Sequence, residues 1–339
     1  MHRNAPLTVE GRRRLCNRIM VARTINSERT RMSTYDRQSG WVRHLSGVIV
    51  AMCTPFELDG SVDSERVPSY IDFLVSRGVA AVMVGGTTGE FIAMSVRERA
   101  TLISTVVRSV DGRVPVIAHV GHVVLEDALR LADGAATAGA TALATIVPYF
   151  QPYSELAIID HLRSCAGQTP ELPIFVYNYP AVTGNRLTAE GFVELLDAPN
   201  IAGIKLSMET MYEIEPFLQF LPDVCVASGN DAVWGEFTAK GGRAVVSGSA
   251  AVVPELAVAM LQSYLAGDEH EVESLKVLFD EFNQLAHDGA PLLLKEILRS
   301  RGLDIGSARI RSVSPRETPP TVCPSDTLSN HISWQITSV

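Results

Sequence analysis

The chain contains little lysine, since only four of its 29 basic residues are lysines and all the others are arginines. It also contains few cysteines, and no two of the five form a C-x-x-C pair. This spacing predicts neither a zinc site nor a disulfide framework, so we expect reduced thiols in a cytoplasmic protein. No apolar run approaches the roughly 20 residues of a membrane-spanning helix, and we expect no membrane contact.

The 339 residues carry a net charge of −9, and 46% of them are hydrophobic, which is typical of a globular protein. An acidic globule binds phosphate backbones poorly, so nucleic acid is not an expected partner. Residues 1–45 differ from the rest, with ten arginines against three acidic residues. This composition indicates a disordered extension, an upstream start with true initiation at Met32, or an organellar transit peptide.

Short apolar runs alternate with amphipathic segments over residues 46–268. The runs are residues 47–55, 80–86, 114–121, 140–148, 173–180, 201–207, 224–230 and 244–249. Each run is apolar on both faces, as in a buried parallel strand. Eight such strand–helix units predict an α/β fold, the (β/α)8 TIM barrel. A doubly wound sheet would need a Gly-rich phosphate loop after the first strand, where this chain has Thr54–Pro55.

Helix signals occur both within the barrel units and after the eighth unit. Ser95 followed three residues later by Glu98 predicts a capped helix that runs to Val110. Two helical stretches without a partner strand lead us to expect C-terminal helices over residues 269–303, packed on the barrel. Residues 304–339 end in a Pro-, Ser- and Thr-rich stretch without periodicity, and this composition predicts a disordered tail.

Lys205 is the candidate nucleophile. It lies in the apolar strand sequence IAGIKLS, where an unpaired ammonium is costly to bury. Burial lowers the pKa of a lysine and exposes a nucleophilic amine, which arginine cannot provide. We therefore predict a Schiff-base lysine, the alternative being a buried ion pair with Glu90 or Asp231. The remaining lysines are interpreted as ordinary surface residues: Lys240, Lys276 and Lys295.

Other polar groups also stand at strand ends, where such barrels carry their catalytic residues. Thr87 and Thr88 in GGTTGEF offer hydroxyl and N–H groups suited to a small carboxylate, or form an ordinary capped turn. Tyr177 in VYNYP is either a proton shuttle or a packed barrel tyrosine. His119 and His122 make an incomplete metal set, so we interpret them as pocket lining or polar packing and expect no metal site.

Three of these segments, GTTGE, YNYP-x-x-TG and GIK, resemble in order and spacing the dihydrodipicolinate synthase / N-acetylneuraminate lyase family. The resemblance covers residues 46–303. It implies a homotetrameric or dimeric barrel with class I aldolase chemistry on pyruvate or another 2-oxo acid, without metal or organic cofactor. By position it implies that Lys205 forms the imine, Tyr177 transfers protons, and Thr87 and Thr88 hold the carboxylate.

The resemblance also implies a lining for the substrate. Gly229 and the backbone at Val246 border the 2-oxo acid, and Asp231 faces the variable half of the substrate. Ser207 and Ser247 add hydroxyl groups near the same strand ends.

Departures from the family pattern bear on the substrate. Val182 replaces an arginine that binds the aldehyde's carboxylate in the synthases, and Phe150 replaces a second tyrosine of the proton relay. IAHVG and PYFQPYS instead resemble the neuraminate lyases, and YNYPAVTG resembles the 2-keto-3-deoxygluconate aldolases. The chain is thus expected to be closer to the lyase and 2-keto-3-deoxy sugar acid aldolase branch than to the true synthases.

These features together predict a lyase that cleaves, or condenses, a 4-hydroxy-2-oxo acid such as a 2-keto-3-deoxy sugar acid. The partners are then pyruvate and an aldehyde. A dehydratase or a 4-hydroxy-tetrahydrodipicolinate synthase-type condensation remains an alternative within the family. A catalytically silent barrel that binds a keto acid is an alternative of another class, kept open by Phe150.

Overall fold

The computed structural model describes residues 45–220, 223–289 and 291–310. Its eight strands form a closed barrel in chain order, which confirms the predicted (β/α)8 TIM barrel. The strands are β1 (Gly47–Ala51), β2 (Ala81–Val84), β3 (Val116–His119), β4 (Ala142–Ile146), β5 (Ile174–Asn178), β6 (Ile201–Leu206), β7 (Cys225–Ser228) and β8 (Ala244–Ser247). Each strand lies within its predicted apolar run. All residues of β2 to β8 are buried, as expected for parallel strands.

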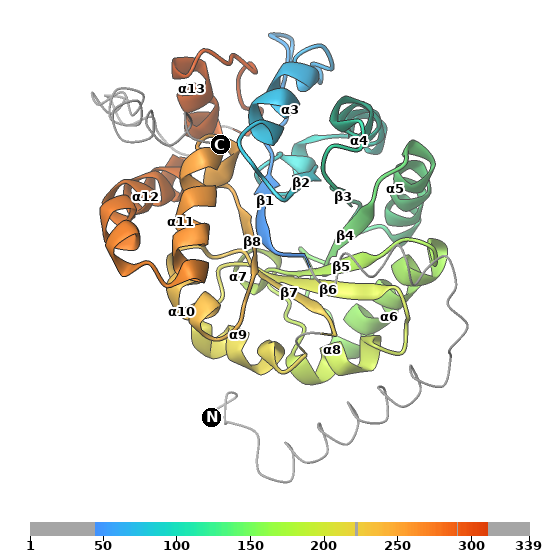
Figure 1. The fold of residues 1–339 in the computed structure, drawn as a ribbon. Coiled ribbons are helices and arrows are strands. Elements are labelled where there is room, and N and C mark those ends of the chain that lie inside the picture. The colour runs from blue at the N-terminus through green and yellow to red at the C-terminus, as the bar shows by residue number, and fades with distance from the viewer. Residues whose placement is uncertain (1–44, 221–222, 290, 311–339) are drawn as a thin grey trace. The chain divides into compact units, whose positions relative to one another are not determined.

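Helices connect the strands and follow the last one (Figure 1). They are α3 (Val67–Val75), α4 (Val96–Val110), α5 (Leu125–Ala138), α6 (Glu155–Gln168), α7 (Pro180–Thr183), α8 (Ala189–Leu195), α9 (Met211–Leu218), α10 (Trp234–Ala239), α11 (Pro254–Ala266), α12 (Glu269–Gly289) and α13 (Leu292–Ser300), with short 3-10 turns η1 (Phe91–Ala93), η2 (Asp231–Val233) and η3 (Ser249–Ala251). The predicted cap of α4 is confirmed, because Ser95 and Glu98 form a reciprocal capping box. None of the described helices is long and apolar enough to cross a membrane.

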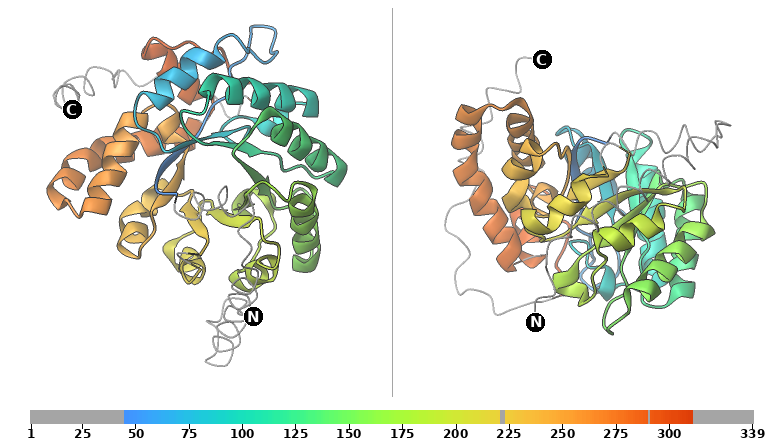
Figure 2. Two further views of the ribbon diagram at one scale, coloured as in Figure 1. Left: turned by 45° about the vertical axis from the view of Figure 1, so that its right-hand side comes forward. Right: turned by 90° about the horizontal axis from the view of Figure 1, so that it is seen from below.

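The chain divides into two compact units. Among the described residues, unit 1 comprises residues 45–47 and 115–246, and unit 2 comprises residues 48–114 and 247–310. Within unit 1, α5, α6 and α8 pack successively against one another. Within unit 2, α3 packs on α4, and α12 packs on both α11 and α13. Figure 2 shows α11 and α12 side by side in both views.

The start of the expected C-terminal tail is an ordered part of unit 2. Ile305 is fully buried and Ala308 nearly so. The Ile305 carbonyl accepts a hydrogen bond from the Phe56 amide at 3.1 Å. The segment from 304 to 310 is therefore packed rather than disordered. The expected N-terminal extension up to residue 44 and the tail from 311 onward lie outside the described residues.

Candidate active site

Lys205 and Tyr177 form the centre of the candidate site in unit 1. They are directly paired in the register of β5 and β6, so their side chains leave the sheet on the same face. The Lys205 side chain is buried, with Nζ 3.9 Å from the centre of the Tyr177 ring. None of the ion pairs among the described residues includes Lys205, and Glu90, one of its two suggested partners, pairs elsewhere. A buried lysine amine that no ion pair of the described residues engages is a candidate nucleophile for a carbonyl carbon.

Two further rings surround Tyr177. The His119 ring meets it edge-on, with ring centres 5.8 Å apart, and Tyr179 stacks on it at 6.0 Å. Burial and the neighbouring phenol of Tyr177 raise the pKa of Tyr179. Sequence reasoning interpreted His119 as pocket lining or polar packing, and its ring lies against that of Tyr177, but it missed Tyr179. The available signal was its position two residues after Tyr177, since alternate residues of an extended chain share a face.

Gly229 and Ser207 lie beside the lysine. The Gly229 amide donates a hydrogen bond to the Leu206 carbonyl at 2.6 Å, which brings the end of β7 close to β6. A Cβ at Gly229 would lie 2.9 Å from Cε of Lys205 and 2.5 Å from Oγ of Ser207. Only glycine therefore leaves room for the lysine side chain in this conformation.

Glu209 is a buried carboxyl group that sequence reasoning missed. It lies four residues after Lys205, and its Oε1 accepts a hydrogen bond from Asn178 Nδ2 at 3.3 Å. Asn230 Nδ2 donates to the Glu209 backbone carbonyl at 3.1 Å. Oε2 is buried and has no hydrogen-bond partner among the described residues. Burial raises the pKa of Glu209 from its ordinary 4.5 to about 8, against the smaller opposing effects of Arg186 and Lys205, so this group is an uncharged acid at neutral pH.

Replacing Glu209 with glutamine is expected to change how stability depends on pH. Because the folded pKa is raised, folding takes up a proton between about pH 4.5 and 8, and the free energy of unfolding of the wild type falls as pH rises through that window. The fall is at most about 1.4 kcal/mol per pH unit. Glu209→Gln removes it, which urea denaturation at several pH values will measure.

Glu213→Gln is the matched control in the same region. Glu213 pairs with Arg186 at 2.7 Å, and its hydrogen bonds to Thr210 and Arg186 outweigh burial and lower its pKa. Its removal is therefore expected to leave the downward slope between pH 4.5 and 8 intact. Parallel stability curves for wild type and Glu209→Gln would contradict the assignment.

The other predicted site residues are divided between the units. In unit 1, Val246 is buried on β8 and Asp231 is half-buried at the start of η2. In unit 2, Thr87 is exposed and Thr88 half-buried in the turn after β2. Ser247 is buried, and its Oγ accepts the Ala250 amide at 3.1 Å.

Thr88 also approaches the end of β8 within unit 2. A Cβ at Gly248 would lie 3.3 Å from Thr88 Oγ1, so glycine keeps the threonine hydroxyl close to that backbone. Within the described ranges, no group of three or more His, Cys, Asp and Glu side chains is arranged to hold a metal ion.

One lysine prediction is wrong. Lys295 is not a surface residue, because its side chain is 1% exposed and its Nζ lies 3.0 Å from Glu90 Oε1. Lys240 and Lys276 are confirmed as surface residues, paired with Glu215 and Asp280. The helical pattern of α13 misled the prediction, since Lys295 lies on its buried face beside Leu294 and Leu298.

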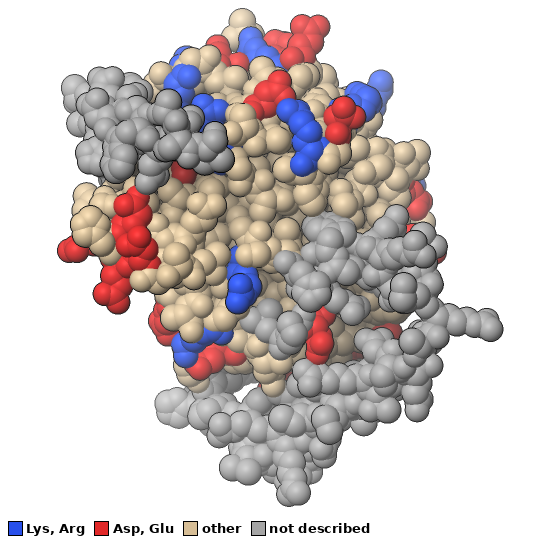
Figure 3. All heavy atoms as spheres, viewed as in Figure 1, with Lys and Arg blue, Asp and Glu red and all other residues tan. Residues whose placement is uncertain are grey.

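The positions that depart from the family pattern are accessible. Val182 in α7 is 59% exposed. Phe150 is 88% exposed and has a positive φ of 78°. Arg186, four residues after Val182, is another arginine to consider for binding an anionic substrate, but it is already paired with Glu213. On the face drawn in Figure 3, acidic and basic side chains lie interspersed, without a broad area of one sign.

Comparison with known proteins shows which family the chain belongs to. Residues 44–318 match the model of the dihydrodipicolinate synthetase family, which is most of the chain. The chain belongs to this family. It is accordingly an enzyme of the pyruvate-dependent lyase and aldolase class, as the motifs on β2, β5 and β6 predict.

Relatives in the family have both kinds of activity. The chain is 34% identical over 266 residues to an N-acetylneuraminate lyase of Rhizobium meliloti, covering 78% of this chain and 88% of the relative. It is 32% identical to a 4-hydroxy-tetrahydrodipicolinate synthase of Bacillus velezensis, covering 79% and 93%.

Solved structures divide in the same way. A dihydrodipicolinate synthase from Aquifex aeolicus has a TM-score of 0.75 and 27% identity, over 80% of this chain and 93% of the other. A sialic acid aldolase from Ruminococcus gnavus has a TM-score of 0.74 and 27% identity, over 78% and 90%. The family, rather than the individual substrate, follows from these similarities.

Proposed function

We propose that the protein is a class I aldolase that interconverts a 4-hydroxy-2-oxo acid with pyruvate and an aldehyde, through an imine on Lys205. The observation that carries this proposal is the buried Lys205 amine, 3.9 Å from the Tyr177 ring and outside the ion pairs of the described residues. A 2-keto-3-deoxy sugar acid or a related hydroxy-oxo acid is the proposed substrate class.

The chemistry starts at the amine. Lys205 Nζ attacks the C2 carbonyl carbon, and the resulting carbinolamine loses its hydroxyl as water with a proton supplied by Tyr177. The protonated imine then withdraws electrons as the C3–C4 bond breaks. The C4 hydroxyl gives its proton to the Tyr177 oxygen, and the aldehyde leaves. Protonation of the enamine at C3 and hydrolysis of the imine release pyruvate and restore the amine.

The remaining site residues have roles in binding. Thr87 and Thr88 are proposed to hold the carboxylate, for which hydroxyl and N–H donors in a turn are suited. Gly229 and Val246 border the 2-oxo acid. Ser207, Ser247 and Asp231 are proposed to bind hydroxyl groups of the aldehyde half, and Glu209 is an additional uncharged donor in unit 1.

A synthase-type condensation is the second candidate, favoured by relatives of 32–35% identity that are named 4-hydroxy-tetrahydrodipicolinate synthase. Two features of the site count against it. Val182 has no guanidinium to bind a second carboxylate, and Arg186 is engaged by Glu213. Oligomer formation and a cytoplasmic location remain expectations from the family.

We expect neutral polyhydroxy aldehydes to be preferred over aspartate semialdehyde as condensation partners. Asp231 would repel an anionic aldehyde, whereas hydroxyl groups find donors and acceptors in Ser207 and Asp231. The test is a panel of 4-hydroxy-2-oxo acids assayed for pyruvate release. It is followed by competitive condensation of both aldehyde classes at saturating pyruvate.

Val182→Arg provides a matched variant for this test. The new guanidinium is expected to raise kcat/KM for aspartate semialdehyde and leave that for neutral aldehydes nearly unchanged. Comparable kcat/KM values for the two aldehyde classes in the wild type would restore the synthase alternative. Absence of pyruvate release from every compound of the panel would contradict the aldolase proposal.

A further inference from the structure

Unit 2 contains a buried ion pair that the proposed chemistry leaves without a role. Glu90 and Lys295 have side-chain exposures of 0% and 1%, and Oε1 of Glu90 and Nζ of Lys295 form an ion pair at 3.0 Å. Nζ also lies 4.2 Å from the centre of the Phe56 ring. Removing two charges from water is costly, and a well-packed apolar pair often stabilises a fold equally well. Stability alone therefore does not explain the pair.

Glu90 ends the turn that carries the two threonines. It adopts the left-handed conformation with φ of 59°, which is unusual for a residue other than glycine. Its amide donates to the Thr87 carbonyl at 2.9 Å, which closes the turn around Thr88. Thr54 Oγ1 holds the preceding residue by donating to the Gly89 carbonyl at 2.6 Å. The position of Glu90 thus determines where the turn and its hydroxyls lie.

The packed segment 304–310, here called the C-terminal clasp, supplies the other partners of the pair. The Ile310 amide donates to Glu90 Oε2 at 2.7 Å. Lys295 Nζ donates to the Ser307 carbonyl at 2.9 Å. Both charged groups are therefore held by the clasp as well as by each other.

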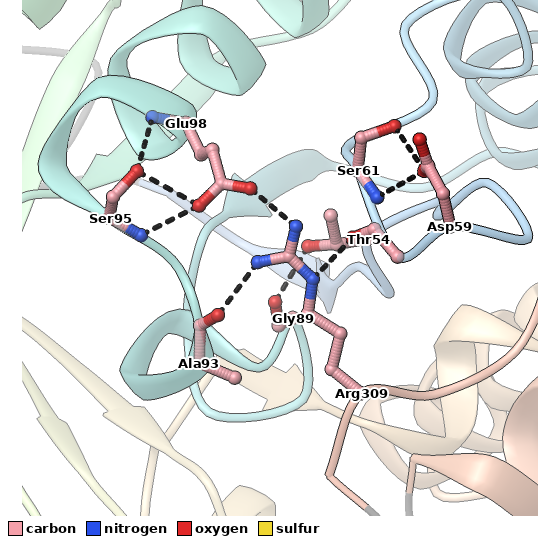
Figure 4. A network of polar contacts seen from close by, with 9 residues as sticks. Thr54, Asp59, Ser61, Gly89, Ala93, Ser95, Glu98 and Arg309 are labelled. Carbon is pink, nitrogen blue, oxygen red and sulfur yellow. Dashed lines mark hydrogen bonds and ion pairs between the residues drawn. The ribbon is translucent and has the colours of Figure 1, made fainter.

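Arg309 extends the same network to the start of α4 (Figure 4). It donates to the carbonyls of Gly60 at 2.6 Å and Ala93 at 2.7 Å, and it pairs with Glu98. The hydrogen bond from Arg309 to Glu98 is the main reason that the pKa of Glu98 is lowered from 4.5 to about 2. The chain that follows the two threonines is thus held at Glu90, at Ala93 and at Glu98 by the clasp.

We propose that Glu90 and Lys295, locked by the C-terminal clasp, are positioning residues that set the affinity of the enzyme for the carboxylate of its 2-oxo acid. The inference rests on the proposed function, in which Thr87 and Thr88 bind that carboxylate. Loss of the pair releases Glu90 from its constrained conformation, and the donors of the turn then no longer converge on the carboxylate.

The test compares two carbonyl compounds, of which only one has a carboxylate. The full chain is titrated with pyruvate or with acetone, and the Lys205 imine is trapped with borohydride and quantified by mass spectrometry. In Lys295→Met, the half-saturating pyruvate concentration is expected to rise about tenfold, the effect of roughly one lost hydrogen bond. The half-saturating acetone concentration is expected to change less than about twofold, because acetone does not use the turn.

Two further variants keep the test decisive. Glu90→Gln/Lys295→Met leaves no unpaired buried charge, so it is expected to fold and to show the same selective loss for pyruvate. Lys276→Met removes an exposed lysine of α12 and is expected to behave as wild type. An unchanged pyruvate titration in the folded double variant, or equal weakening for acetone, overturns the inference while the proposed function stands. If wild type traps no pyruvate at all, the proposed function fails and the inference falls with it.

Discussion

Replacing Lys205 with arginine is expected to abolish covalent trapping of pyruvate and to lower kcat by about 10⁴-fold or more, as loss of a nucleophile does in other enzymes. Arginine keeps the positive charge and much of the volume of lysine, but its guanidinium does not lose its proton and forms no imine. The loss would therefore reflect chemistry rather than charge. A retained melting temperature would show that the variant still folds.

Peptide mapping after borohydride reduction locates the adduct in the wild type. The strongest rival is Lys295, because it is also buried and its burial lowers its pKa. Its amine, however, is engaged by Glu90 and by the Ser307 carbonyl. Lys295→Met is thus the matched control, which at high pyruvate should retain the adduct on Lys205. An adduct on Lys240, Lys276 or Lys295 would contradict the assignment.

Replacing Gly229 with alanine is expected to lower kcat by about 100-fold, because a displacement of about 1 Å in a reacting group has an effect of that size. The new methyl group would lie 2.9 Å from Cε of Lys205, 2.5 Å from Oγ of Ser207 and 3.1 Å from the Leu206 carbonyl oxygen. The two side chains can move, but the backbone oxygen cannot move easily. The amine is therefore displaced from its position against the Tyr177 ring.

Gly134→Ala provides the control for adding a methyl group to a glycine of unit 1. Gly134 is exposed in α5, and a Cβ there meets no atom within 4 Å. This variant is expected to gain up to about 1 kcal/mol of stability and to keep its turnover. Steady-state kinetics and borohydride trapping of both variants measure the difference. Wild-type turnover in a folded Gly229→Ala protein would mean that the lysine does not depend on this glycine.

The order of elements follows from local sequence. Each strand lies inside an apolar run, and Ser95 with Glu98 caps α4 as their spacing predicts. These features depend on hydrogen bonds and burial among residues close in the chain, and such effects are visible in a short window.

The candidate site was only partly predictable. Lys205 stands out because a chain nearly free of lysine places one in an apolar strand, and Tyr177 stands out through its motif. Their contact depends on the register of β5 against β6. Glu209 had no signal in the sequence, because its pKa depends on the residues that close around it.

Lys295 illustrates what only the tertiary structure decided. In the sequence it is a charged residue in an amphipathic helix, which normally faces water. Its partner Glu90 is 205 residues away, and the clasp residues that complete the pair are Ser307 and Ile310. The sequence by itself determined the elements, the family motifs and the candidate nucleophile, because each is set by near neighbours. Pairing between polar groups that are distant in the sequence depends on how the chain packs. An unpaired charge becomes costly, and therefore needs a partner, only where the surrounding residues exclude water.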